Sequence, residues 1–202
     1  MSEMTLALVI FLFPLAYSPG PGNMFFAACG ARFGFRATLP ASAGYHLATW
    51  VVTVAIGLGL VTTLQTAPGL FQALKLAGAA YVLWIAARFL GAGVASTTPD
   101  ARPAARAATF RDGAVLLLLN PKAYVIIALM FTQFLDDDTG AALIPVIAIT
   151  SIFTLTNLVA FSLWSGAGAR VARVFARAGS ARALNVTFAA ILALLALWMV
   201  LA

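Results

Sequence analysis

The chain has 202 residues, of which 63% are hydrophobic and only 9% are charged, and its formal net charge is +6. Soluble domains carry about 25% charged residues because water must wet their surface, so this composition excludes a soluble globular protein. We expect the excess apolar surface to face a lipid bilayer, with residues 1–202 forming one transmembrane domain.

Six apolar stretches follow one another, each near the roughly 20 residues that a spanning helix needs. The first has Glu3 as its only charge and no positive leader region, so we interpret it as a retained span and not a cleavable signal. The sequence therefore predicts an all-α integral membrane protein with six transmembrane helices. In chain order the stretches are Thr5–Cys29, Thr38–Leu64, Pro68–Leu90, Gly113–Leu135, Ala141–Trp164 and Ala183–Ala202.

All ten arginines lie in or flank the odd-numbered connections between these stretches, and the even-numbered connections carry no Lys or Arg. Cytoplasmic loops collect Lys and Arg, so the pattern predicts that both termini are extracytoplasmic. Because the charge serves as an orientation signal spread over three loops, we expect no nucleic-acid partner. The arginines are Arg32, Arg36, Arg88, Arg102, Arg106, Arg111, Arg170, Arg173, Arg177 and Arg182.

The six stretches divide into two three-helix halves, about 1–91 and 112–202, joined by a hydrophilic cytoplasmic loop over 92–111. Three helices per half gives the halves opposite orientations, which is the inverted-repeat architecture of many transporters. Pro19 and Pro21 interrupt the first stretch, and Pro121 interrupts the fourth. A proline inside a helix frees backbone groups that lipid cannot satisfy. We predict two broken helices that form one central site, with two ordinary proline kinks as the alternative.

Two lysines lie within the stretches. Lys122 is 11 residues past Arg111, which places it roughly 16 Å inward, near the middle of the bilayer. An ionisable residue at this depth is a functional-site hypothesis by default. Lys122 can bind a substrate carboxylate or cap the carbonyls freed in the first helix, and snorkelling is the alternative. Lys75 lies only about 10 Å below the outer surface, where function and snorkelling are both open.

Polar side chains form a stripe on the second helix and a similar one on the fifth. Such stripes can line a hydrated path, or simply hydrogen-bond within and between helices. The residues are Ser42, His46, Thr49 and Thr53 on the second helix, and Thr150, Thr154 and Asn157 on the fifth.

Two residues are candidates for proton coupling. His46 has an ordinary pKa near neutrality and can carry a proton, or it can serve as a structural hydrogen-bonding group. Asp112 stands at the cytoplasmic mouth of the fourth helix, where it can also act as a helix cap. No spanning stretch contains an obvious Asp or Glu.

Motifs of enzymes, cofactor sites and metal sites are absent from the sequence. There is no HExxH, no pair of intramembrane aspartates, no nucleotide-binding glycine loop and no Cys/His cluster. The single cysteine, Cys29, cannot form a disulfide within the chain. We therefore expect no catalytic residue, no cofactor and no metal.

Three motifs in order resemble those of the lysine exporter (LysE/RhtB) superfamily, over essentially the whole chain. Ser18–Pro21 is similar to its (T/S)PGP signature, Leu74–Trp84 to its LKxxGAAYLLW pattern, and Leu118–Ala123 to its LLNPKA motif. The resemblance implies proton-driven export of amino acids or related small metabolites across a bacterial inner membrane. It carries over as motif positions Pro19, Gly20, Pro21, Lys75, Asn120, Pro121 and Lys122.

The combined prediction is a secondary active exporter with alternating access at a midplane site. Freed N–H groups and Lys122 would hold a carboxylate, and freed carbonyls would hold the ammonium group. Asn23, Asn120 and Asn157 complete the expected substrate site. Because no buried acid is evident, we expect a neutral amino acid. The expected partners are the amino acid, protons and the bilayer, with a homodimer as an option, and the alternatives are a passive channel and a membrane-embedded enzyme.

Overall fold

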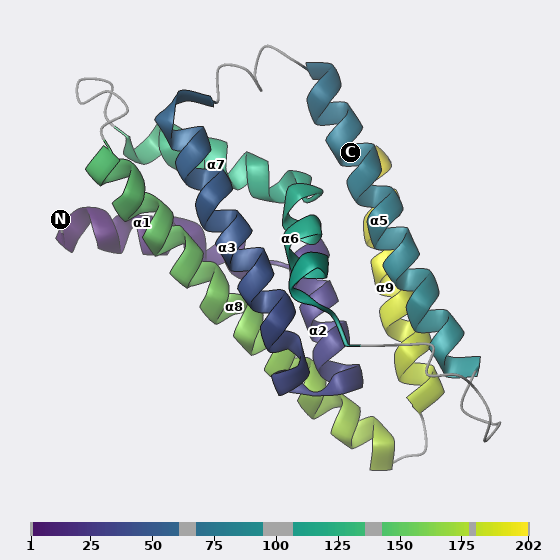
Figure 1. Ribbon diagram of the computed structural model, residues 1–202. Helices are drawn as coiled ribbons and strands as arrows, with labels where there is room; N and C mark the ends of the chain where they lie inside the picture. The colour runs from purple at the N-terminus through teal and green to yellow at the C-terminus, as the bar shows by residue number, and fades with distance from the viewer. Residues whose placement is uncertain (1, 61–67, 95–106, 136–142, 178–180, 202) are drawn as a thin grey trace.

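The computed structural model describes residues 2–60, 68–94, 107–135, 143–177 and 181–201 (Figure 1). These residues form helices joined by short connections, and none of them lies in a strand. The predicted all-α class is confirmed for this part of the chain.

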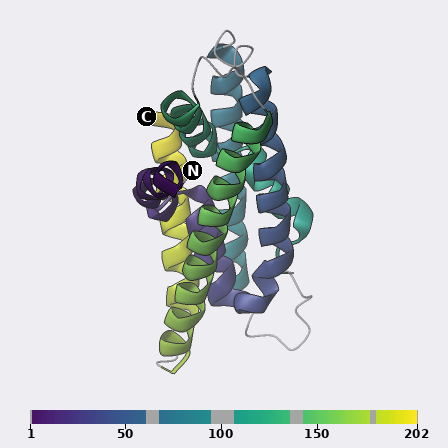
Figure 2. The same ribbon diagram turned by 90° about the vertical axis from the view of Figure 1, so that its left-hand side faces the viewer.

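Two of the expected spans are broken where the sequence predicts. The first consists of α1 (Ser2–Tyr17) and α2 (Pro21–Phe33), bent by 62°. The second consists of α6 (Phe110–Leu118) and α7 (Pro121–Phe134), bent by 63°. A proline opens each second half, where its missing N–H and fixed φ suit the first helical position. As a result α1 crosses the long helices instead of running along them, and Figure 2 views it end-on.

Two other stretches are continuous enough to cross a membrane. One runs through the 3-10 turn Phe35–Thr38, α3 (Leu39–Ala55) and the π-helical turn Ile56–Leu60. It contains Gly59 at φ 107°, and the expected continuation to Leu64 falls outside the described residues. The other is α8 (Leu143–Arg177).

The expected end of the fifth helix at Trp164 is wrong. The 35 residues of α8 continue to Arg177, so three arginines assigned to a connection lie on the helix. At about 1.5 Å per residue α8 is roughly 52 Å long, well beyond a hydrocarbon core of about 30 Å. The helix continues through the glycines at 166 and 168.

The last pair, α5 (Pro68–Val94) and α9 (Ala181–Leu201), pack along each other on one side of the bundle (Figure 1). By length and composition, two described stretches qualify as spans, or up to four when each bent pair counts as one. The halves also pack differently, because α2 lies along α8 whereas α7 contacts α1 and α5. Six spans in an inverted repeat therefore stay a prediction.

The described surface is rich in exposed aliphatic side chains on several helices. Ile10 is 63% exposed, Leu155 60% and Leu194 66%. Apolar surface spread this widely is unusual in a soluble monomer. It agrees with the lipid-facing exterior that the composition predicts.

Reciprocal glycine contacts bring two helix pairs together at the backbone. Between α2 and α8, a Cβ on Gly30 would overlap the carbonyl of Ser165, and one on Gly168 would overlap the carbonyl of Ala27. Between α3 and α6, Gly44 meets the Phe110 carbonyl in the same way, and Gly113 meets that of Ala41. Small residues allow such close approach in membrane helix pairs. Each broken span is thus held by one half against a long helix.

Gly168→Ala should destabilise the protein, because the added methyl group has no room beside Ala27. We expect a loss of about 1–3 kcal/mol in detergent, measured by thermal unfolding. Gly166→Ala on the same helix is the matched control, since nothing lies within 4 Å of its added Cβ. That control should be neutral or gain up to about 1 kcal/mol from helix propensity. Equal stability of the two variants in thermal unfolding would contradict the close contact between Gly168 and Ala27.

Candidate functional site

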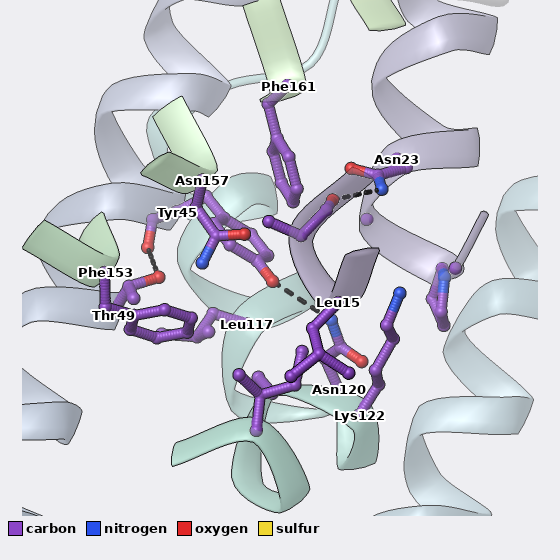
Figure 3. A pocket seen from close by; sticks show the side chains of 16 residues that line it. Leu15, Asn23, Tyr45, Thr49, Leu117, Asn120, Lys122, Phe153, Asn157 and Phe161 are labelled. Atoms are coloured by element: carbon purple, nitrogen blue, oxygen red, sulfur yellow. Dashed lines mark hydrogen bonds between the residues drawn. The ribbon is translucent and has the colours of Figure 1, made fainter. Parts of the chain in front are cut away.

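The two helix breaks meet at one cavity, which α3 and α8 close from the side (Figure 3). Its empty volume, including the opening, is about 350 Å³. The cavity combines a polar end, formed by the breaks, with an apolar and aromatic wall. It is lined by Leu15, Ala16, Gly20, Pro21, Gly22, Asn23, Tyr45, Thr49, Leu117, Asn120, Lys122, Ala123, Ile126, Phe153, Asn157 and Phe161.

Lys122, in the first turn of α7, ties the second break to the first. Its Nζ donates to the backbone carbonyl of Ser18 at 3.0 Å and to the Ser18 Oγ at 2.9 Å. The Ser18 hydroxyl in turn donates to the carbonyl of Leu15 at 3.1 Å. A Cβ on Gly20 would lie 3.0 Å from Lys122 Cδ, so the glycine leaves room for the lysine stem. Of the two roles predicted for Lys122, the structure shows the capping of freed carbonyls.

Asn23 caps the same break from the side of α2. Its Nδ2 donates to the carbonyls of Ala16 at 2.8 Å and Ser18 at 2.7 Å. Since both partners can only accept, the amide orientation is fixed. The Oδ1 of Asn23 is then buried without a hydrogen-bond partner. The carbonyls at this end of α1 thus already accept from Asn23 and Lys122, and the expectation that freed carbonyls hold a substrate ammonium group stays a prediction.

Both second halves begin without a side-chain cap. Gly20 precedes α2 and Asn120 precedes α7, and neither position makes a side-chain capping bond. Asn120 instead donates from Nδ2 to the hydroxyl of Tyr45 at 3.0 Å, and its Oδ1 has no partner. The first N–H groups of a helix have no partner within the helix, and the helix dipole favours negative charge there. The cavity thus gathers two positive helix ends and one ammonium group.

Aromatic rings form a wall beside the breaks, where Phe161 lies against Gly22 and Tyr45 against Asn120. The rings of Tyr45 and Phe161 are 4.6 Å apart, and Phe26 lies 4.9 Å from Phe161. Phe153 closes the wall beside Thr49. Sequence reasoning missed Tyr45, Phe153 and Phe161 as site residues because aromatic residues are common on apolar helices. The one available signal was Tyr45, since a buried phenol needs a hydrogen-bond partner.

The predicted site residues divide into those that line the cavity and those that do not. His46 lies behind the wall, where its ring contacts Tyr45 and Phe161. Asp112 caps α6, because its carboxylate accepts from Thr109 N–H at 2.7 Å. Helix capping was the predicted alternative to a role in proton coupling. The side chain of Lys75 lies outside the described part of the chain. Gly20, Pro21, Asn23, Asn120, Lys122 and Asn157 line the cavity, whereas Pro19 and Pro121 lie at the breaks without lining it.

Asn23→Ala should destabilise the first break, because it leaves the buried carbonyl of Ala16 without its amide donor and the part-buried carbonyl of Ser18 with Lys122 as its remaining donor. We expect a loss of about 1–3 kcal/mol in thermal unfolding of the purified protein. Thr132→Ala is the control, since that hydroxyl is exposed and bonds only to carbonyls of its own helix. An Asn23→Ala variant as stable as the control would show that the carbonyls need no donor from Asn23.

Comparison with known proteins identifies the family of the chain. The family model for LysE type translocators matches residues 13–202. A homoserine/homoserine lactone efflux protein of Salmonella typhimurium is 27% identical over 86% of this chain and 84% of the relative. A leucine efflux protein of Enterobacter is 28% identical over 79% of this chain and 77% of the relative. An uncharacterized membrane protein of Pseudomonas aeruginosa is 30% identical over 79% of this chain and 76% of the relative. No solved structure gives a significant match. The chain belongs to the LysE type translocator family.

Proposed function

We propose that the protein exports amino acids by alternating access at the cavity between the two helix breaks. The observation that carries the proposal is the meeting of two uncapped helix N-termini and Lys122 at one buried site. Family membership and the efflux function named for two relatives support the same class of activity. The membrane is the bacterial inner membrane, with both termini extracytoplasmic, as the arginine pattern indicates.

The substrate carboxylate binds between the N-termini of α2 and α7. The N–H groups there point along the helix axes and attract an anion. Lys122 adds a full positive charge, and the carboxylate replaces Ser18 as partner of its Nζ. A charged hydrogen bond of this kind is about twice as strong as a neutral one. The site therefore holds the part that all amino acids share.

The ammonium group binds to the two amide oxygens that the fold leaves unpaired. Asn23 Oδ1 and Asn120 Oδ1 are buried acceptors without partners, and they come from the two sides of the cavity. Among the described residues that line the cavity there is no Asp or Glu, so a second positive charge on the substrate would find no counter-ion among them. The wall of Leu117, Ile126 and Phe153 suits a small aliphatic side chain. The substrate class is a neutral, apolar amino acid.

Transport needs the cavity to open to one side at a time. We assign the driving force to the proton gradient, with His46 as the coupling residue, because it is buried next to the aromatic wall. Separation of the two breaks would first require the bond between Lys122 and Ser18 to open. Binding of a carboxylate by Lys122 compensates for that bond, which links substrate binding to the movement.

A metabolite survey of medium from cells that overexpress the protein tests the activity. One neutral amino acid should accumulate outside, above the level of cells with an empty vector. Inverted vesicles should then concentrate that amino acid, and a protonophore should abolish the uphill movement. Movement only down the gradient would instead identify a passive channel. Turnover of a lipid or peptide by the purified protein would identify an enzyme and overturn the proposal.

Lys122→Met keeps the length of the side chain but removes its charge. The export rate should therefore fall, although the variant still inserts into the membrane normally. A charged hydrogen bond is worth about 1.5–3 kcal/mol, so we expect a loss of roughly ten- to a hundred-fold in the export rate. Lys122→Arg keeps the charge and should retain more activity. Val125→Ala, on the lipid-facing side of α7, is the control for insertion. Unchanged export by Lys122→Met would remove this residue from the mechanism.

A further inference from the structure

Polar side chains of α3 and α8 face each other along the contact between these helices. The register is fixed by Trp50, whose Nε1 donates to Ser151 Oγ at 3.3 Å, and by Gly57, which lies against Val146. This register puts Thr53, one turn back from Gly57, opposite Thr150, one turn on from Val146. Further turns place Thr49 by Thr154 and His46 by Asn157, whose backbone carbonyl lies near the imidazole. We call these six residues the α3–α8 polar seam.

Four polar atoms of this seam are buried without a hydrogen-bond partner. They are the hydroxyl oxygens of Thr53, Thr150 and Thr154 and the Nε2 of His46. Thr53 and Thr150 are fully buried. Each such group costs about 1–3 kcal/mol when it is left unpaired. Four of them along one contact call for a partner that bridges the two helices.

The bonding of other threonines shows that the open hydroxyls are unusual. Thr49 donates to the carbonyl of Tyr45 at 2.8 Å, and Thr156 donates to that of Ile152 at 2.8 Å. A helical threonine can usually satisfy itself in this way, four residues back. Thr53, Thr150 and Thr154 do not, so their hydroxyls are free to take a partner from within the seam.

His46 has an open acceptor facing the same seam. Its Nδ1 lies 2.7 Å from the carbonyl of Ser42, and a carbonyl can only accept, so Nδ1 carries the proton. The Nε2 of the neutral ring is then an unpaired lone pair. The groups packed on the imidazole are the phenol of Tyr45 from α3 and, from α8, the uncharged Phe161 and Asn157. No charged side chain among these contacts competes for the proton.

The seam is continuous with the cavity at one end and closed by apolar residues at the other. Thr49 and Asn157 line the cavity. Beyond Thr53 the contact becomes apolar, where Gly57 lies against Phe131 and Val146. That end is farthest along α3 from Arg36, so it is the extracytoplasmic end in the predicted orientation.

We propose that water molecules fill the α3–α8 polar seam and form a proton path that leads from the cavity toward the extracytoplasmic side and ends at the apolar contact of Gly57, which movement of α3 against α8 would open. Bridging waters satisfy buried polar groups of this kind in many proteins. A proton delivered through them binds His46 Nε2 and makes an imidazolium. The same proton later leaves Nε2, which restores the neutral ring. The inference rests on the proposed proton-driven export and adds its route.

Thr53→Val and Thr150→Val, alone and together, test the route, because valine keeps the shape and removes the hydroxyl. In vesicles with a proton gradient, uphill export should be lost. Exchange of labelled for unlabelled amino acid without a gradient should continue, since the cavity itself is unchanged. Thr53→Ser and Thr150→Ser keep the hydroxyl and should restore gradient-driven export. Thr132→Val, on the exposed side of α7, is the control.

Two transport results would overturn the path. If the seam holds no water, the valine variants keep gradient-driven export. They also unfold at a higher temperature, because an unpaired buried hydroxyl has been removed. Loss of exchange together with gradient-driven export would place these hydroxyls in substrate binding instead.

A readout without transport separates failure of the path from failure of the proposed function. Radiolytic hydroxyl-radical labelling marks side chains beside bound water. Phe131, which closes the far end of the seam and does not line the cavity, should therefore be labelled in the wild type and less so in Thr53→Val/Thr150→Val. If the wild type shows no gradient-driven export, the proposed function fails, and the labelling still decides whether the seam holds water. Equal labelling of both proteins would overturn the seam as a water site.

Discussion

The structure depends on one constraint, which is that backbone groups freed inside a membrane must find partners within the protein. Each proline break exposes carbonyls on one side and N–H groups on the other. At the first break, Asn23 and the ammonium group of Lys122 donate to the carbonyls at the C-terminal end of α1. The N–H side is left without side-chain caps at both breaks. This asymmetry gives the cavity its positive character, on which the proposed carboxylate site depends.

The same constraint explains why the two breaks lie together. An isolated broken helix would leave its carbonyls to lipid, but Lys122 reaches across from α7 to the carbonyl of Ser18. One break therefore supplies what the other lacks. Tyr45 repeats the arrangement on the other side, since its hydroxyl accepts from Asn120. The aromatic wall is thus part of the support of the second break as well as a boundary of the cavity.

Much of this fold could be predicted from the sequence, because proline has a local effect that spacing reveals. The breaks at Pro21 and Pro121 follow from the residue itself, whereas the depth of Lys122 in the bilayer stays a prediction from counting along a helix. The extent of α8 could not be predicted, because Gly168 looks like a stop until its contact with Ala27 is seen. The role of Asn23 was also hidden, since an amide can bind a ligand or the backbone and only the fold decides. The aromatic wall depends on which helix faces meet, and no single helix carries that information.

The paired glycine contacts have a consequence for which parts can move. Helices that touch at the backbone cannot slide without a clash, so α2 with α8, and α3 with α6, are expected to behave as two rigid units. Each unit takes one helix from either half of the sequence, so the moving bodies are not the halves that the repeat suggests. The boundary between the units runs through the cavity and along the facing sides of α3 and α8. A tilt of one unit against the other would therefore open the cavity and the α3–α8 polar seam at the same time.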